Sequence, residues 1–168
     1  FSTARTFDCG QCFRFGPLSD EISPPSADCQ YAVSGIAYGK QVAFADNGTH
    51  LYVYATPEDF QAIWKQYLGL DADYVQANQQ ILQSLAGADR QHMQTALEAS
   101  RGIRILHQEP WEALCSFIIS QNNNIPRIRK IIEALCREYG EQITGGWAFP
   151  TPDALARAGK DAIFSLGA

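Results

Sequence analysis

Two regular apolar patterns flank a short polar segment, residues 121–127, in the second half of the chain. On each side, apolar residues recur at intervals of three and four, the period of one face of an α-helix. The upstream set is Trp111, Leu114, Cys115, Ile118 and Ile119, and the downstream set is Ile128, Ile131, Ile132, Leu135, Cys136 and Tyr139. Three consecutive asparagines are too few for a flexible linker. The pattern therefore predicts two buried helices that meet at a rigid, amide-rich joint.

The composition indicates an ordinary globular protein. The chain has 168 residues, of which 46% are hydrophobic and 18% charged, so it is not disordered and suits one domain or two small ones. The net charge of −5 argues against a chain that is basic throughout, although a local basic patch is still compatible with it. No apolar run is long enough to span a membrane, and the five cysteines, an odd number, favour a reduced, cytoplasmic protein.

The N-terminal part carries the signals of β-strands. Apolar or alternating runs lie at 7–15, 31–34, 37–45 and 51–54, and we expect Gly35 and Gly39 to separate the second strand from the third. The last two runs are joined by Asp46-Asn47-Gly48, which is typical of a hairpin turn. Residues 20–28 are rich in serine, proline and alanine and predict a loop. Together these signals predict an antiparallel meander of about four or five strands.

From Thr56 onward the pattern is helical. Thr56 is expected to cap a helix that has Pro57 at its first position. Further helices are expected from Asp71 or Asp73, over 89–100, from Pro110 to the asparagines, from there to Gly140 as a C′ glycine, and from Thr151 after a loop at 144–152. This order predicts an α+β fold. We expect residues 1–56 to form an antiparallel β-rich domain, 57–70 a helix packed on it, and 71–168 an all-helical part.

Cys9-Gly10-Gln11-Cys12 is a lone pair of cysteines with two residues between them. A redox motif of this spacing starts a helix, whereas this one lies in a run that resembles a strand. A structural zinc site needs a second pair, and the remaining cysteines are Cys29, Cys115 and Cys136. We therefore expect neither a metal nor a cofactor here. Gly10 is the more informative residue, because a glycine within a strand marks a bulge or a close approach of the backbone to another group.

The joint carries more polar and basic residues than a turn requires. Asparagines suit turns and helix caps, which accounts for one or two of the three at positions 122–124. Arg127, Arg129 and Lys130 follow in the first turns of a helix, where the helix dipole disfavours cations. A phosphate at that end would reverse this preference by accepting from free N–H groups and pairing with the cations. The segment is therefore compatible with a plain turn and with a contact to nucleic acid.

Three segments together resemble the family of 8-oxoguanine DNA glycosylases, over essentially the whole chain and in the same order: Phe7–Phe15, Pro110–Glu112 and Phe117–Ile128. The resemblance implies a β domain similar to the TATA-binding protein, followed by part of a helix-hairpin-helix glycosylase domain. It implies a bacterial-type, monomeric base-excision repair enzyme that acts at the nucleoid. Such an enzyme flips 8-oxoguanine out of double-stranded DNA, excises it, and cleaves the backbone as an AP lyase.

The resemblance also implies roles for individual residues. Gly10 matches the glycine whose backbone carbonyl reads the N7 hydrogen of the oxidised base, and Phe117 matches an aromatic residue near the lesion pocket. Asn122 matches the asparagine that fills the space left by the flipped base. Arg127 matches the arginine that binds the orphaned cytosine, for which its planar donor fork is suited. Contacts to DNA are expected as well from the residues beside these two, Asn123, Asn124, Arg129 and Lys130.

The chain departs from the family pattern in its lysines. The family places its catalytic lysine in a glycine-rich hairpin and its catalytic aspartate further on, and no lysine of this chain follows such a hairpin: Lys40, Lys65, Lys130 and Lys160. We therefore interpret the sequence as the N-terminal part of the enzyme, with both catalytic residues beyond Ala168 and no glycosylase activity in the 168 residues alone. Two alternatives are an alkylated-base glycosylase of the same fold and a non-catalytic DNA-binding module.

Overall fold

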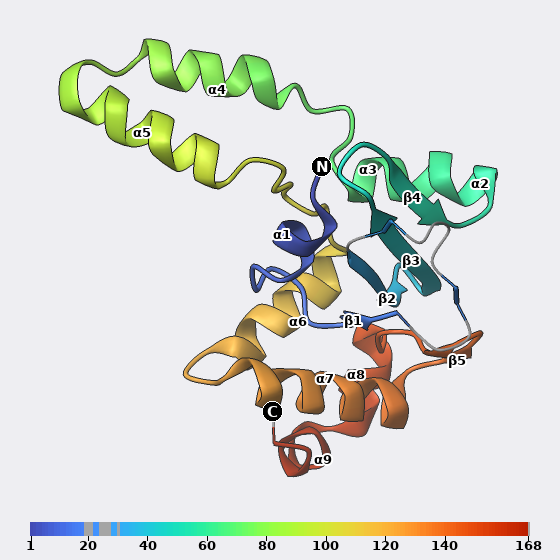
Figure 1. Cartoon of the computed structure of the whole chain (residues 1–168). Coiled ribbons are helices and arrows are strands. Elements are labelled where there is room, and N and C mark those ends of the chain that lie inside the picture. Colours follow the sequence, from blue (N-terminus) through green and yellow to red (C-terminus); the bar gives the residue numbers. More distant parts are fainter. Residues whose placement is uncertain (19–21, 24–27, 30, 168) are drawn as a thin grey trace.

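The computed structural model describes residues 1–18, 22–23, 28–29 and 31–167 (Figure 1). Four antiparallel strands form a sheet in the order β1-β2-β3-β4. They are β1 (Phe15–Pro17), β2 (Tyr31–Ala37), β3 (Lys40–Asp46) and β4 (Leu51–Tyr54). The hairpin turn that was expected after Asp46 is confirmed, because β4 returns from it in register with β3. The predicted loop at 20–28 lies mostly outside the described residues.

Gly35 does not end a strand, as its position in the sequence suggested, but lies inside β2 opposite Phe15 of β1. A Cβ atom at position 35 would lie 2.5 Å from the carbonyl oxygen of Arg14 and 2.7 Å from the ring of Phe15. The ring therefore occupies the space that a side chain would need. Glycine is required here so that β1 can pair with β2, and the predicted break at Gly35 is wrong. The second predicted break, at Gly39, is confirmed, because Gly39 lies in the turn between β2 and β3 with φ +69°.

The prediction of a strand over 7–15 is also largely wrong. Residues Thr3–Phe7 form a short helix, α1, residues 8–14 have no regular structure, and pairing begins only at Phe15. The start of α1 is fixed by a distant residue, because the Thr3 amide donates to the buried carboxylate of Asp46 at 2.7 Å. An anion at this end also suits the helix dipole. A contact over 43 residues leaves no trace in the local pattern.

The main core lies between one face of the sheet and the helical segment that follows β4. This segment comprises α2 (Pro57–Asp59), the π-helical turn η1 (Phe60–Trp64) and α3 (Lys65–Tyr67). The expected cap is confirmed, since Thr56 accepts from the Asp59 amide at 3.1 Å. The buried residues of this core are Phe7, Cys12, Phe15, Val33, Ala37, Val42, Phe44, Trp64, Tyr67, Leu68 and Leu106. Five of these rings contact one another, so aromatic packing joins α1, the sheet and α3.

The remaining helices are α4 (Tyr74–Gln83), α5 (Gly87–Ala99), α6 (Pro110–Ser120), α7 (Ile125–Tyr139), α8 (Pro152–Ala158) and α9 (Lys160–Ser165). Asp73, one of the two expected caps, accepts from the Gln76 amide at 2.8 Å. The α4–α5 hairpin projects from the rest of the chain, and neither of its helices has a buried residue (Figure 1). None of the described helices combines the length and the apolar character that crossing a bilayer requires.

A small hairpin, β5 (Gln142–Ile143) and β6 (Gly146–Trp147), occupies part of the segment expected to be a loop. Gly140 precedes it with an extended backbone (φ −82°), so the prediction of a left-handed C′ glycine is wrong. Glycine is needed there for another reason. A Cβ atom at position 140 would collide with the carbonyl oxygens of Ala148 and Cys136.

The two helices of the joint differ in how their apolar faces are covered. The predicted stripe of α7 is buried from Ile128 to Cys136. On α6 the prediction is only partly correct, because Leu114 is 51% and Ile118 61% exposed, whereas Ser116 is buried. Helical spacing shows that α6 has an apolar face. It does not show whether another part of the described chain covers that face.

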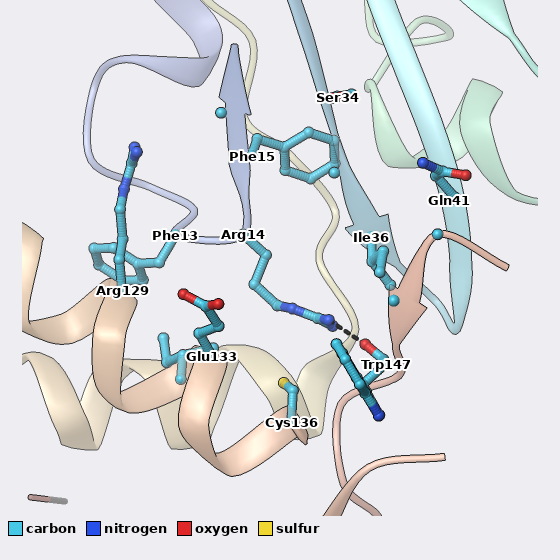
Figure 2. Close-up of a pocket in the computed structure, with 15 residues that line it drawn as sticks. Phe13, Arg14, Phe15, Ser34, Ile36, Gln41, Arg129, Glu133, Cys136 and Trp147 are labelled. Atoms are coloured by element: carbon cyan, nitrogen blue, oxygen red, sulfur yellow. Dashed lines mark hydrogen bonds between the residues drawn. The ribbon is translucent and has the colours of Figure 1, made fainter. Parts of the chain in front are cut away.

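A buried ion pair connects the irregular segment 8–14 to the helical part. The Arg14 Nη1 atom lies 3.5 Å from Glu112 Oε2, and both side chains are about nine-tenths buried. Arg14 also donates through Nη2 to the carbonyl oxygen of Trp147 in β6 (Figure 2). Burial raises the pKa of the Glu112 carboxyl above its usual value, and the charge of Arg14 only partly opposes this effect. Arg14 therefore holds α6 and β6 together at the end of β1.

We predict that Arg14→Ala destabilises the fold by about 3–5 kcal/mol at neutral pH, because it leaves a buried carboxylate without its partner. The loss should shrink as the pH falls through the raised pKa of Glu112, since the protonated acid needs no counter-charge. Denaturant unfolding at several pH values measures both effects.

Arg137→Ala is the matched control. It removes an exposed i,i+4 partner of Glu133 whose guanidinium also lies over the Trp147 ring, and it should cost at most about 1 kcal/mol at any of these pH values. Equal losses for the two variants would contradict the account.

Candidate nucleic-acid interface

The structure brings Gly10 and Phe117 to the same cavity, although they are 107 positions apart in the sequence. The cavity has a volume of about 290 Å³, at the small end for a ligand site, and lies between the loop of Gly10 and helix α6. Its lining residues are Gly10, Gln11, Phe13, Gln108, Ala113, Ser116, Phe117 and Ser120. It therefore offers one exposed aromatic ring and several amide and hydroxyl groups, a combination suited to a flat, polar ligand.

Gly10 has a backbone conformation that favours glycine. Its φ is +81°, in the left-handed region that side chains disfavour. A Cβ atom built at this position would meet nothing within 4 Å, so internal crowding is not what requires the glycine. The exposed backbone of Gly10 can thus approach a ligand closely.

At the joint, two of the three asparagines are used to build the turn. Asn124 is the N-cap of α7, because its Oδ1 accepts from the Arg127 amide at 3.0 Å. Asn123 donates from Nδ2 to the carbonyl oxygen of Ile119 at 3.2 Å and accepts through Oδ1 from the Asn124 amide at 3.0 Å. These bonds close the end of α6 onto the start of α7. A structural role is therefore sufficient to explain both residues.

Asn122 has no such role. Its side chain is exposed and makes no hydrogen bond to the described residues, and its φ is +52°. Asparagine tolerates this left-handed conformation better than most residues, but the conformation is still uncommon. Asn122 lines a shallow, open recess together with Asn123, Asn124 and Arg127. The turn thus presents one free amide and one exposed guanidinium side by side to the solvent.

The three basic residues of the joint do not form one patch. Arg127 lies at the recess and Lys130 is exposed, but Arg129 lines a different cavity of about 420 Å³ with Phe13 and Glu133 (Figure 2). The Nε of Arg129 is buried and has no hydrogen-bond partner among the described residues. The contact of Arg129 with DNA stays a prediction, and its position does not favour it.

The cysteines of the Gly10 loop differ in environment. Cys9 is exposed, whereas Cys12 is buried in the main core. Burial raises the pKa of the Cys12 thiol to about 12, although the nearby charge of Arg129 opposes it, so this thiol is not ionised at neutral pH. Within the described residues no group of three histidine, cysteine or acidic side chains is arranged to hold a metal ion.

Sequence reasoning missed Gln108 and Ser116, which line the cavity from the link before α6 and from α6 itself. Ser116 could have been suspected, because it is a small polar residue in the middle of a mostly apolar helix. Gln108 carries no comparable signal. Its place depends on contacts between segments almost one hundred residues apart.

Stability measurements can distinguish the structural role of Asn124 from that of Asn122. Asn124→Ala should lower the free energy of unfolding by about 1 kcal/mol, because it removes a helix cap. Asn122→Gly should change it by less than about 0.5 kcal/mol, since glycine adopts a positive φ freely while gaining entropy in the unfolded chain. Urea unfolding of both variants checks this, and a large loss with Asn122→Gly would show that this side chain has a structural role.

The chain is similar to known proteins in sequence and in fold. The family model described as 8-oxoguanine DNA glycosylase, N-terminal domain, matches residues 1–114. An N-glycosylase/DNA lyase of Saccharomyces cerevisiae is 47% identical over 73 residues, which are 40% of this chain and 19% of that protein. The apo structure of the 8-oxoguanine glycosylase/lyase of Clostridium acetobutylicum has a TM-score of 0.82 at 31% identity, and covers 99% of this chain and 54% of that one.

The Clostridium protein has also been solved with double-stranded DNA containing cytosine opposite 8-oxoG, and that structure has a TM-score of 0.81 at 30% identity. The matched region covers 99% of this chain and 53% of that one, so the chain spans about half the length of this relative. A 3-methyladenine DNA glycosylase from Archaeoglobus fulgidus, at 15% identity and a TM-score of 0.55 over 82% of this chain and 51% of that one, shares the fold alone. The α+β fold expected from the sequence and the resemblance are confirmed.

Proposed function

This chain belongs to the 8-oxoguanine DNA glycosylase family, and on that premise we propose that it forms the part of a base-excision repair enzyme that recognises the lesion. The parent activity is the release of 8-oxoguanine from duplex DNA with associated AP-lyase cleavage. One chain supplies both recognition sites described above, so we propose that a single copy engages the duplex, in the compartment that holds the DNA.

We propose that the cavity of Gly10 and Phe117 accepts the flipped base. Oxidised guanine carries a hydrogen on N7, whereas N7 of normal guanine is an acceptor. A backbone carbonyl accepts a hydrogen bond from the first and is repelled by the lone pair of the second. Gly10, with its exposed backbone and no side chain, supplies such a carbonyl at the rim of a cavity with an aromatic wall. Flipping costs a few kcal/mol, which contacts in the pocket and at the vacated site must offset.

We propose that the joint contacts the duplex at the position that the flipped base has left. The observation that carries this proposal is that Asn122 alone of the three asparagines is left free, in a left-handed conformation that exposes its amide. Asn122 would fill the space of the flipped base, and Arg127 beside it would bind the orphaned cytosine. Asn123 and Asn124 hold Asn122 in position through the hydrogen bonds that close the turn. Lys130 would pair with a backbone phosphate near the N-terminus of α7.

The residues that line the cavity of Gly10 and Phe117 contribute to binding and supply no amine for the reaction. Displacement of a base with formation of a Schiff base needs an amine nucleophile, and no lysine lines the cavity shared by Gly10 and Phe117. We propose that the lysine and the aspartate of this chemistry come from outside residues 1–168. The protein expressed from its complete coding sequence is therefore the form in which activity should be measured.

DNA-binding assays separate the proposed roles. With a duplex containing 8-oxoguanine opposite cytosine, Asn122→Gly and Arg127→Ala should each weaken binding by about 1–3 kcal/mol, roughly 5- to 150-fold. Lys130→Ala should weaken binding to damaged and undamaged duplexes alike and reduce the slope of log K against log salt by about 1. Arg137→Ala, which removes an exposed cation further along the same helix, is the control and should change little. Unchanged binding by Asn122→Gly and Arg127→Ala would refute the assignment.

The alternative functions are tested by base release. With the protein expressed from its complete coding sequence, we expect 8-oxoguanine to be released in preference to 3-methyladenine from otherwise identical duplexes. The reverse preference would favour the alkylated-base glycosylase. Binding without release of either base would favour the non-catalytic module.

A further inference from the structure

We propose that Gln11 is a positioning residue that sets how well oxidised guanine is distinguished from normal guanine. It acts through its neighbour Gly10, and the inference rests on the function proposed above. Gly10 itself is exposed and a Cβ atom there would have no neighbour within 4 Å, so packing does not fix where its backbone lies. The residues on either side of it must do so.

The carboxamide of Gln11 bonds to three separate backbone groups. Its Nε2 donates to the carbonyl oxygen of Thr6 at 2.8 Å, at the end of α1, and to that of Arg104 at 2.9 Å. Its Oε1 accepts from the Leu106 amide at 2.9 Å. A carboxamide has two donor hydrogens and one acceptor oxygen, so these three bonds use it almost fully. Gln11 thereby ties the Gly10 loop both to α1 and to the extended link before α6.

A second glutamine holds the backbone of the same residue. Gln108 donates from Nε2 to the carbonyl oxygen of Gln11, and it lines the cavity together with Gly10 and Phe117. The loop has no regular hydrogen bonding of its own over 8–14. The two glutamines therefore replace the backbone hydrogen bonds that a strand would have supplied. They fix Gln11, the residue that directly follows Gly10, against the segment that leads into α6.

Holding the backbone of Gly10 in place affects the specificity for oxidised guanine more than the overall affinity for DNA. A carbonyl tells the two bases apart only if it lies within hydrogen-bonding distance of N7, and a hydrogen bond weakens steeply with distance and angle. A loop that shifts would lose the bond to oxidised guanine and the repulsion of normal guanine together. Contacts from Asn122 and Arg127 come from another element and would persist. Loss of the Gln11 contacts should thus reduce discrimination while general DNA binding remains.

Gln11→Met is the direct test, because methionine has a similar length and cannot form these bonds. Dissociation constants are measured for duplexes that differ only in 8-oxoguanine or guanine opposite cytosine, with the protein expressed from its complete coding sequence. We expect the variant to lose about tenfold or more in affinity for the damaged duplex while its affinity for the undamaged one changes less than about twofold. Val53→Ala, which trims the main core at strand β4, is the control for general destabilisation and should leave the ratio unchanged.

The outcomes distinguish this inference from the function on which it rests. If the unmodified protein does not prefer the damaged duplex, the proposed function fails. If it does, and Gln11→Met keeps the ratio or weakens both affinities equally, only the positioning role fails. Should Gln11→Met not fold, Gln108→Met takes its place under the same criterion, because it removes the bond to the Gln11 backbone and keeps the carboxamide of Gln11 intact.

Discussion

The candidate site depends on hydrogen bonds between the irregular segment 8–14 and the link 103–108, which lie almost one hundred residues apart. Gln11 bonds to the backbone of both Arg104 and Leu106, and Gln108 bonds back to Gln11. The Arg14–Glu112 pair fixes the far end of the same segment to α6. Side-chain amides and one buried ion pair thus hold this segment in place, as backbone hydrogen bonds would hold a β-strand. They leave the backbone of Gly10 free for a ligand.

Helix α6 connects the two proposed recognition sites. Phe117 lines the cavity from its last turns, and Asn122 follows its final residue after a single position. The two residues are therefore less than two helical turns apart along the chain. Because Asn123 and Asn124 close the turn onto α7, the free Asn122 is held at a set position relative to Phe117. A protein that must hold a flipped base and fill the space it left needs such a rigid spacing.

The sequence predicted what local chemistry decides. The caps at Thr56 and Asp73, the hairpin after Asp46 and the buried face of α7 follow from neighbouring residues, and the structure confirms them. The failures share a cause in distant partners. Asp46 fixes the start of α1, a helix that the local pattern did not predict, and Phe15 makes Gly35 part of a strand. Whether the apolar face of α6 is buried depends on which other segment packs on it, and local spacing does not show this. At the site, the motif residues were found from resemblance, but only contacts showed which asparagine is free and that Arg129 lies apart.

A crystal structure of the protein, expressed from its complete coding sequence and bound to a duplex with 8-oxoguanine opposite cytosine, is the most direct test. The account predicts the oxidised base in the cavity between Gly10 and Phe117, with Asn122 in the vacated space of the duplex and Arg127 on the cytosine. One copy of the chain must hold the flipped base and also place its own joint in the vacated space. A duplex bound along the α4–α5 hairpin, or a flipped base held away from Gly10, would contradict it.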